Sequence, residues 1–251
     1  MAEQTYTALV TGASSGIGRA FCQRLAERCD RIVAVARRDD RLLELQQELA
    51  PEVELVPVQA DLATVEGVTR CTEAIRQEGP IDLLVNNAGI SVFGPYTDAD
   101  IDLQLDTVRV NVEALMVLTR AALPFMRERG GGAVINVASI GAFLPMRDTV
   151  VYGASKAFVQ SFCSSLQEEV RGDNIRIQCL CPGMTRTEIH DTPMFEGFDK
   201  TRIPEELWMD SAEVVDLSLA ALEEDRVVVV TGETNVAMAR AAVQATMDSI
   251  Q

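Results

Sequence analysis

Short runs of apolar, mostly β-branched residues alternate with amphipathic segments along almost the whole chain. Segments of helical length separate the successive runs, and runs that are apolar on both faces indicate a parallel sheet covered by helices on both sides. The pattern predicts an α/β protein: a single Rossmann-like doubly wound domain over residues 1–251, with a seven-stranded parallel sheet. The predicted strands are residues 7–10, 31–36, 53–60, 81–86, 132–138, 175–181 and 226–230.

Helix predictions rest on the spacing of apolar residues and on proline. Residues 16–28 and 150–170 form predicted helices, and Leu42, Leu45 and Leu49 form one apolar stripe of another. A long helical stretch is expected from about 99 to 129, and Pro124 should kink or split it.

Two segments near the end of the chain depart from this alternation. The irregular segment from about 184 to 210 is longer than an ordinary connection, so it is either a functional lid over a substrate site or disordered. A short helix is expected from about 235 to 250, after the seventh strand.

Charge and composition exclude several classes of partner. The net charge of −16 would repel nucleic acid and anionic membrane surfaces, so neither is expected as a partner. We find no basic leader followed by an apolar run and no apolar stretch of membrane-spanning length, and we expect a cytoplasmic protein. The six cysteines lack a disulfide or zinc-site spacing, which predicts reduced thiols and no metal.

An early stretch, VTGASSGIGRA, matches two unrelated mechanisms. A G-x-S-x-G match would make Ser14 a strained nucleophile that needs the chain's single histidine, His190. Gly12, Gly16 and Gly18 could instead form a glycine-rich turn that brings backbone N–H groups to the phosphates of a nucleotide. The turn follows the first predicted strand, whereas the hydrolase elbow follows several strands, so the nucleotide interpretation is favoured.

Five motifs then occur in one order along the chain, and together they resemble the short-chain dehydrogenase/reductase family. They are TGASSGIG at 11–18, NNAG at 86–89, Ser139, YGASK at 152–156 and CPG at 181–183. The resemblance implies an NAD(P)-binding oxidoreductase that moves a hydride between a nicotinamide cofactor and a carbonyl or alcohol substrate.

Four residues are the expected catalytic group. Tyr152 and Lys156 are four residues apart, so they share one face of a predicted helix, and a nearby ammonium favours the phenolate form of tyrosine. Tyr152 is therefore the expected general acid and base. Ser139 ends the fifth predicted strand, where it would position the substrate oxygen. The resemblance further implies that Lys156 holds the nicotinamide ribose and that Asn111 supports a proton relay through water.

The second strand predicts the cofactor. Ala36 stands where an NAD-specific site has an acidic residue, and Arg37 and Arg38 follow it. A guanidinium suits a 2′-phosphate, so NADP(H) is expected, with Arg37 the stronger candidate. Asp39 and Asp40 begin the next helix or reach a ribose. The resemblance assigns the other cofactor contacts to Gly12, Ser14, Ser15, Gly16, Ile17, Gly18, Asp61, Leu62, Asn87, Ala88, Gly89, Tyr152, Lys156, Pro182, Gly183, Thr185 and Thr187.

The substrate pocket should be mainly apolar. Three segments supply its expected walls, residues 91–96, 141–146 and 184–209, with the side chains Phe93, Phe143, Leu144, Met146, Met194, Phe195, Phe198 and Trp208. The leading hypothesis is an NADP(H)-dependent carbonyl reductase or alcohol dehydrogenase. The alternatives are a catalytically idle redox sensor on the same fold and, more distantly, the Ser14 hydrolase. The resemblance also implies a homo-oligomer, for which we expect a dimer because the final helix would cover a second interface.

Overall fold

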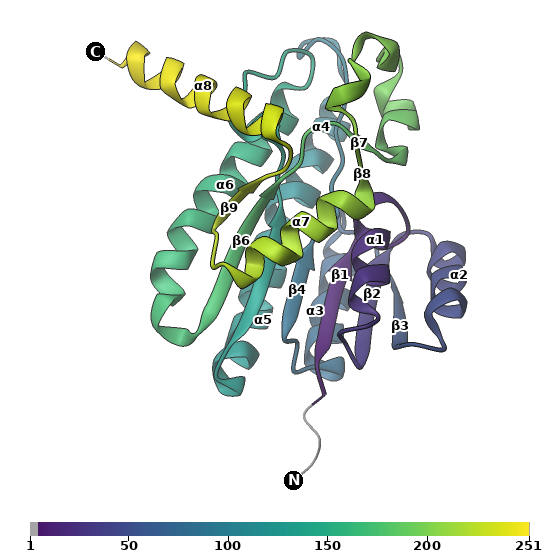
Figure 1. Ribbon diagram of the computed structural model, residues 1–251. Coiled ribbons are helices and arrows are strands. Elements are labelled where there is room, and N and C mark those ends of the chain that lie inside the picture. Colours follow the sequence, from purple (N-terminus) through teal and green to yellow (C-terminus); the bar gives the residue numbers. More distant parts are fainter. Residues whose placement is uncertain (1–4, 251) are drawn as a thin grey trace.

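The computed structural model describes residues 5–250 and places a seven-stranded parallel sheet at the centre of the molecule (Figure 1). The strand order is β3-β2-β1-β4-β5-β6-β9, so the chain reverses direction across the sheet between β1 and β4. This confirms the predicted fold. The strands are β1 (Thr7–Thr11), β2 (Arg31–Ala36), β3 (Glu54–Gln59), β4 (Leu83–Asn86), β5 (Gly132–Val137), β6 (Ile175–Cys181) and β9 (Val228–Val230).

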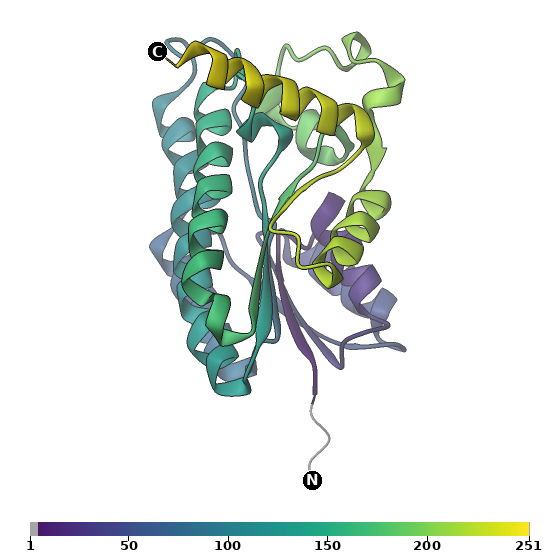
Figure 2. The same cartoon turned by 60° about the vertical axis from the view of Figure 1, so that its left-hand side comes forward.

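Helices cover both faces of the sheet (Figure 2). One face packs on α1 (Gly16–Leu25), α2 (Asp39–Leu49) and α7 (Ser211–Glu223), and the other on α3 (Val65–Glu78), α5 (Leu115–Arg129) and α6 (Val150–Val170). Successive strand residues alternate between the two cores: Ala8 and Val10 belong to the first, and Leu9 to the second. The ligand edge of such a sheet is at the carboxyl ends of its strands.

The predicted helix over 99–129 is interrupted, but at a different place. It comprises α4 (Ile101–Val108), a π-helical turn over Arg109–Ala114 that contains Asn111, and α5, which continues through Pro124 to Arg129. The helix is therefore not split at Pro124. Pro124 and Arg120 are both exposed, so the carbonyl left without an N–H partner faces water and costs little.

The segment between β6 and α7 is folded. It consists of short 3₁₀ turns held at their base by the two-stranded pairing of β7 (Thr185–Arg186) with β8 (Met209–Asp210). The turns span Glu188–Asp191, Pro193–Phe195, Lys200–Arg202 and Glu205–Leu207. We call residues 184–210 the lid segment.

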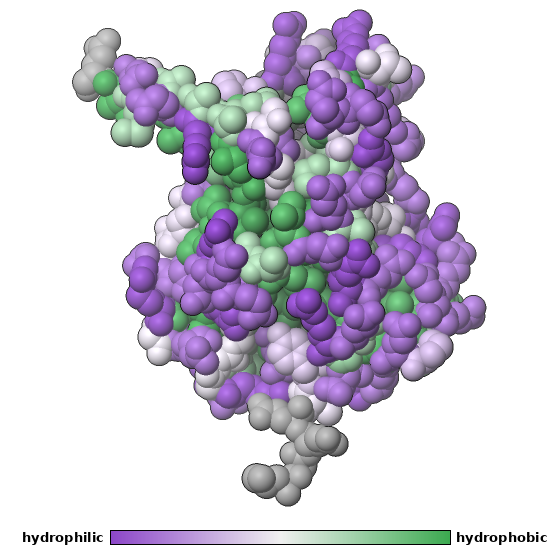
Figure 3. Space-filling model, viewed as in Figure 1, coloured by the Kyte–Doolittle hydropathy of each residue, from purple (hydrophilic) through white to green (hydrophobic). Residues whose placement is uncertain are grey.

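The last helix, α8 (Glu233–Ser249), leaves the body of the molecule (Figures 1 and 2). Asn235 and Ala239 anchor its first half, whereas its side chains are exposed from Val243 onward. Figure 3 shows apolar surface beneath this helix. Leu217 of α7 and Val228 of β9 are partly exposed. No helix within residues 5–250 is both long and apolar enough to cross a membrane.

Candidate active site

The glycine-rich turn after β1 is built around close backbone contacts. Gly12 and Gly16 have φ angles of +69° and +54°, which side chains rarely adopt. A Cβ at Gly18 would lie 2.3 Å from the carbonyl oxygen of Gly12, so helix α1 can begin this close to β1 only with glycine there. The N-terminus of α1 thus presents free N–H groups at the edge of the sheet, as a phosphate site requires.

Asn87 fixes this turn from the neighbouring strand. Its side-chain amide donates to the carbonyl of Thr11 at 2.8 Å, and its backbone N–H donates to the hydroxyl of Thr11 at 3.0 Å. The N–H of Ala88 donates to the same hydroxyl. Thr11, which the sequence analysis did not single out, therefore joins the ends of β1 and β4 at the point where the strand order reverses.

Tyr152, Lys156 and Ser139 meet at the carboxyl end of β5. Tyr152 and Lys156 lie one turn apart on α6, with the Lys156 nitrogen 5.5 Å from the centroid of the Tyr152 ring. Lys156 is buried and donates to the carbonyl of Val137 at 2.8 Å. The side chain of Ser139 neighbours the Tyr152 phenol; its hydroxyl accepts from the N–H of Gly141 at 3.1 Å and donates to the carbonyl of Pro182 at 3.5 Å.

Burial shifts both titratable groups toward their neutral forms. Burial raises the pKa of the Tyr152 phenol above its ordinary value, and the neighbouring Ser139 hydroxyl works in the opposite direction. The net direction for Tyr152 is opposite to the lowering expected from the sequence. Burial lowers the pKa of Lys156 to about 8, so this ammonium still holds its proton at neutral pH.

Asn111 connects the π-helical turn to the loop after β4 and to α6. Its side-chain oxygen accepts from the N–H of Ile90, and its amide donates to the carbonyl of Ile90 and to the hydroxyl of Ser155, each at 3.0 Å. Ser155 donates in turn to the carbonyl of Tyr152 at 2.7 Å. The sequence analysis missed Ser155, although it lies within the YGASK motif. π turns inside helices are frequent at functional sites.

Arg38, rather than Arg37, reaches the glycine-rich turn. The guanidinium of Arg38 donates to the hydroxyls of Ser14 and Ser15 at 3.0 and 2.9 Å. It also forms an ion pair of 2.8 Å with Glu188 of the lid segment. Arg37 is exposed, and its backbone carbonyl accepts from Gln59. The Ser14 hydroxyl, which the hydrolase alternative takes as the nucleophile, thus accepts a hydrogen bond from Arg38.

The other residues expected to contact a cofactor border the same edge. A Cβ at Gly16 would lie 2.9 Å from the methyl group of Thr187, so the lid segment begins directly against the glycine-rich turn. A Cβ at Gly89 would lie 3.4 Å from the Lys156 nitrogen. The carboxylate of Asp61 accepts from the N–H of Ala63, which makes it part of a turn after β3.

Three of these residues serve the turn after β6. A Cβ at Gly183 would lie 2.2 Å from the Asn235 amide, so α8 closes on this turn. The carbonyl of Pro182 accepts from Ile140, and the hydroxyl of Thr185 donates to Gly183. Ile17 lies beside the glycine-rich turn and is half-buried. Leu62 follows β3 and is buried.

Aromatic residues hold the lid segment against the loop after β4. The ring of Phe93 contacts those of Phe195 and Phe198, with centroids 6.3 and 5.5 Å away. The N–H of Phe93 also donates to the carbonyl of Met194 at 2.8 Å. His190 stacks on Phe198 and meets the edge of Trp208, and burial lowers its pKa. We call these five rings the aromatic cluster.

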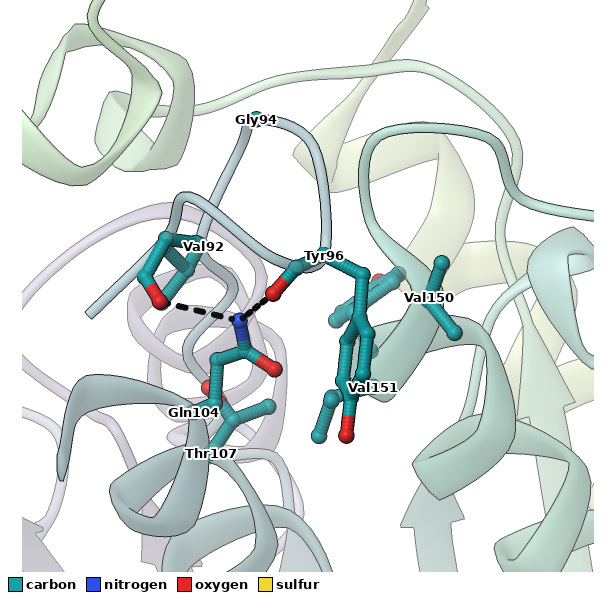
Figure 4. A pocket seen from close by; sticks show the side chains of 9 residues that line it. Val92, Gly94, Tyr96, Gln104, Thr107, Val150 and Val151 are labelled. Atoms are coloured by element: carbon teal, nitrogen blue, oxygen red, sulfur yellow. Dashed lines mark hydrogen bonds between the residues drawn. The ribbon is translucent and has the colours of Figure 1, made fainter. Parts of the chain in front are cut away.

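A small cavity lies between residues 92–107 and the start of α6, and Tyr152 is one of its lining residues (Figure 4). Its volume of about 10 Å³ is close to what one water needs. The amide nitrogen of Gln104 donates to the carbonyls of Tyr96 and Ala99 at 3.1 and 3.4 Å. A larger open cleft of about 820 Å³ is lined by Gly16 and by the lid residues Thr187, Lys200 and Trp208.

Comparison with known proteins shows the family. A model described as short chain dehydrogenase matches residues 6–194, and the chain belongs to this family. A short chain dehydrogenase of Pseudocercospora fijiensis is 39% identical over 190 residues, which cover 74% of this chain and 62% of that protein. A probable NADP-dependent dehydrogenase of Haemophilus influenzae is 34% identical, with 78% of each chain covered.

A solved structure supports the same conclusion over nearly the whole chain. The short-chain dehydrogenase from Sphingobium yanoikuyae in complex with NADPH superposes with a TM-score of 0.85 at 32% identity. The match covers 98% of this chain and 96% of that chain. The family resemblance inferred from the five motifs is confirmed.

Proposed function

We propose that this chain is an NADP(H)-dependent oxidoreductase that interconverts a ketone or aldehyde and an alcohol, with Tyr152 as general acid and base. The observation that carries the proposal is the meeting of the Tyr152 hydroxyl, the Ser139 hydroxyl and a buried lysine at the carboxyl edge of the sheet. Membership of an oxidoreductase family and the NADPH bound by the Sphingobium relative support it.

The residues at the edge of the sheet fit a dinucleotide. The glycine-rich turn offers backbone N–H groups to a pyrophosphate, and Arg38 with Ser14 and Ser15 offers donors to a 2′-phosphate. Lys156, close to Gly89, would hold the nicotinamide ribose. The other residues expected to contact the cofactor, which include Asn87 and Thr187, lie along the same edge of the sheet. When bound, the nicotinamide would supply or accept the hydride.

The protein's own residues would handle the proton. In carbonyl reduction Ser139 and Tyr152 donate hydrogen bonds to the substrate oxygen, and Tyr152 then gives up its proton. Its raised pKa keeps the phenol protonated at neutral pH, which suits a general acid. The positive charge of Lys156 stabilises the phenolate that results. Asn111 keeps the loop after β4 and the Tyr152 turn in register, so that a water could pass a proton to Lys156.

The aromatic cluster and its neighbours favour a mainly apolar substrate. The rings of Phe93, Phe195 and Phe198 contact one another between the loop after β4 and the lid segment, and Phe143 is a partly buried apolar residue packed against the core. Exposed apolar side chains on α4 to α6, such as Ile101, Val117 and Phe158, support a homodimer through these helices.

An assay with NADPH and a panel of apolar ketones and aldehydes tests the proposal. We expect the absorbance of the reduced nicotinamide to fall only when both NADPH and a carbonyl compound are present. The idle-sensor alternative predicts tight NADPH binding with no turnover for any substrate. Hydrolysis of an ester panel without cofactor would instead support the Ser14 alternative.

A further inference from the structure

The ion pair between Arg38 and Glu188 joins two parts of the molecule that are far apart in sequence. Arg38 follows β2 at the cofactor edge, and Glu188 begins the first 3₁₀ turn of the lid segment. The Arg38 guanidinium makes four hydrogen bonds in this cluster: Nη1 donates to Glu188, Nε donates to Ser14, and Nη2 donates to Ser14 and Ser15. Glu188 is the charged partner among these three, so a further anion on Arg38 would either lie beside this carboxylate or replace it.

The position of Glu188 is fixed by its neighbour. The methyl group of Thr187 lies against Gly16, which leaves no room for a side chain there. The carboxylate next in sequence lies over the glycine-rich turn, where its ion pair with Arg38 lowers its pKa. Glu188 is thus a carboxylate placed where Arg38 and the two serine hydroxyls would receive a phosphate.

We propose that Glu188 occupies the 2′-phosphate position on Arg38 in the cofactor-free protein and is displaced from it when the 2′-phosphate binds. This inference rests on the proposed NADP(H) function. Glu188 is then a residue that sets cofactor affinity and couples it to the lid segment, because displacement removes one of the contacts that hold this segment on the glycine-rich turn. A cofactor without the 2′-phosphate leaves the ion pair in place.

The chain contains its own reporter for this coupling. Trp208 is the only tryptophan and lies in the lid segment, with its ring centroid 5.4 Å from that of His190. A movement of the segment that follows the release of Glu188 changes the surroundings of this indole. Adenosine 2′,5′-bisphosphate and adenosine 5′-phosphate differ only in the 2′-phosphate and carry no nicotinamide to quench the emission.

The test titrates these two nucleotides against four proteins: wild type, Glu188→Gln, Arg38→Ala and Glu205→Gln. Glu205 is the control, because this lid carboxylate pairs with Arg186 and not with Arg38. Loss of a competing, half-exposed ion pair should tighten binding of the bisphosphate to Glu188→Gln by about two- to fivefold. Binding of the monophosphate, and both affinities of Glu205→Gln, should stay within the error of wild type.

Trp208 emission gives the second readout. In wild type the bisphosphate should shift the emission and the monophosphate should not, whereas Glu188→Gln should start near the shifted state. Weaker or equal bisphosphate binding by Glu188→Gln, or unchanged wild-type emission, would overturn the displacement of Glu188 by the 2′-phosphate. The NADP(H) assignment would still stand if Arg38→Ala loses affinity for the bisphosphate. If Arg38→Ala binds it as wild type does, the 2′-phosphate is not on Arg38, and both this inference and the NADP(H) assignment fail.

Discussion

The ammonium of Lys156 lies 5.5 Å from the ring centroid of Tyr152, one helical turn away, and is buried with the carbonyl of Val137 as its hydrogen-bond acceptor. Placing a charge at this depth destabilises the fold, and the lowered pKa of Lys156 measures that cost. The same burial makes its field on the phenol strong, since no water screens it. Stability and chemistry are therefore opposed at this residue.

The first prediction concerns Lys156 and pH. Its pKa falls from 10.5 to about 8 on folding, so between these values the unfolded chain binds more protons and stability must rise with pH. Below pH 8 the cost of burying the charge is fully present. Lys156→Met should accordingly be more stable than wild type at neutral pH by about 3 kcal/mol, from 1.36 kcal/mol per pKa unit.

Urea unfolding of both proteins at pH 7 and pH 10 measures this difference. The advantage of Lys156→Met should shrink at the higher pH, because wild-type Lys156 is then neutral in the fold. An advantage that is equal at both pH values, or a variant less stable than wild type at pH 7, would mean that Lys156 carries no burial cost.

The second prediction separates the two arginines after β2. The Arg38 guanidinium donates to Ser14 and Ser15, whereas Arg37 contributes its backbone carbonyl to a hydrogen bond from Gln59. Arg38→Ala should weaken the binding of NADPH about tenfold and leave the binding of NADH nearly unchanged. Tenfold corresponds to the lower end of the contribution of a charge-assisted hydrogen bond. Arg37→Ala should have the smaller effect. Calorimetric titration of both cofactors decides this: a larger NADPH loss in Arg37→Ala would restore the order that the sequence suggested.

The third prediction tests the glycine-rich turn. A Cβ at Gly18 would lie 2.3 Å from the Gly12 carbonyl oxygen, so Gly18→Ala must push α1 away from β1. Overpacking of this kind costs about 1 to 3 kcal/mol, and the displaced N–H groups should bind either nicotinamide cofactor more weakly. Gly172→Ala is the control, because no neighbouring atom of residues 5–250 lies within 4 Å of a Cβ there. Equal melting temperatures for the two variants would show that the turn has room for a side chain at Gly18.

A fourth prediction concerns assembly. If the dimer forms through α5 and α6, Val117→Glu places a charge in its interface and should give a monomer by light scattering after size exclusion. Met247→Glu, at an exposed apolar position of α8, should remain a dimer. Dissociation by the α8 variant alone would move the interface to the end of the chain.

The sequence predicted the parts of this molecule that depend on local pattern. Strand positions follow from runs that are apolar on both faces, and the glycine-rich turn from spacing. The contact of Arg38 with Ser14 and Ser15 could not be predicted this way, because it depends on which side of the chain each side chain leaves after β2. The opposing lid carboxylate, Glu188, lies 150 residues further along.

Asn111 and Tyr152 show two further limits of local pattern. The helical break falls at the π turn that contains Asn111, where contacts with Ile90 and Ser155 stabilise the wider turn, and not at the solvent-facing Pro124. The direction of the Tyr152 pKa depends on burial, which motif spacing does not reveal.

In the proposed reaction Tyr152 supplies the proton that accompanies hydride transfer from a nicotinamide to a carbonyl carbon. NADPH deuterated at the hydride position tests it in wild type and in Tyr152→Phe, with the product carbinol analysed by mass spectrometry. Wild type should place deuterium on the former carbonyl carbon, and Tyr152→Phe should bind NADPH with near wild-type affinity yet give no labelled alcohol. Labelled alcohol formed equally fast by Tyr152→Phe would contradict the proton-donor role of Tyr152. If wild type transfers no label to any carbonyl compound, the proposed hydride transfer is wrong.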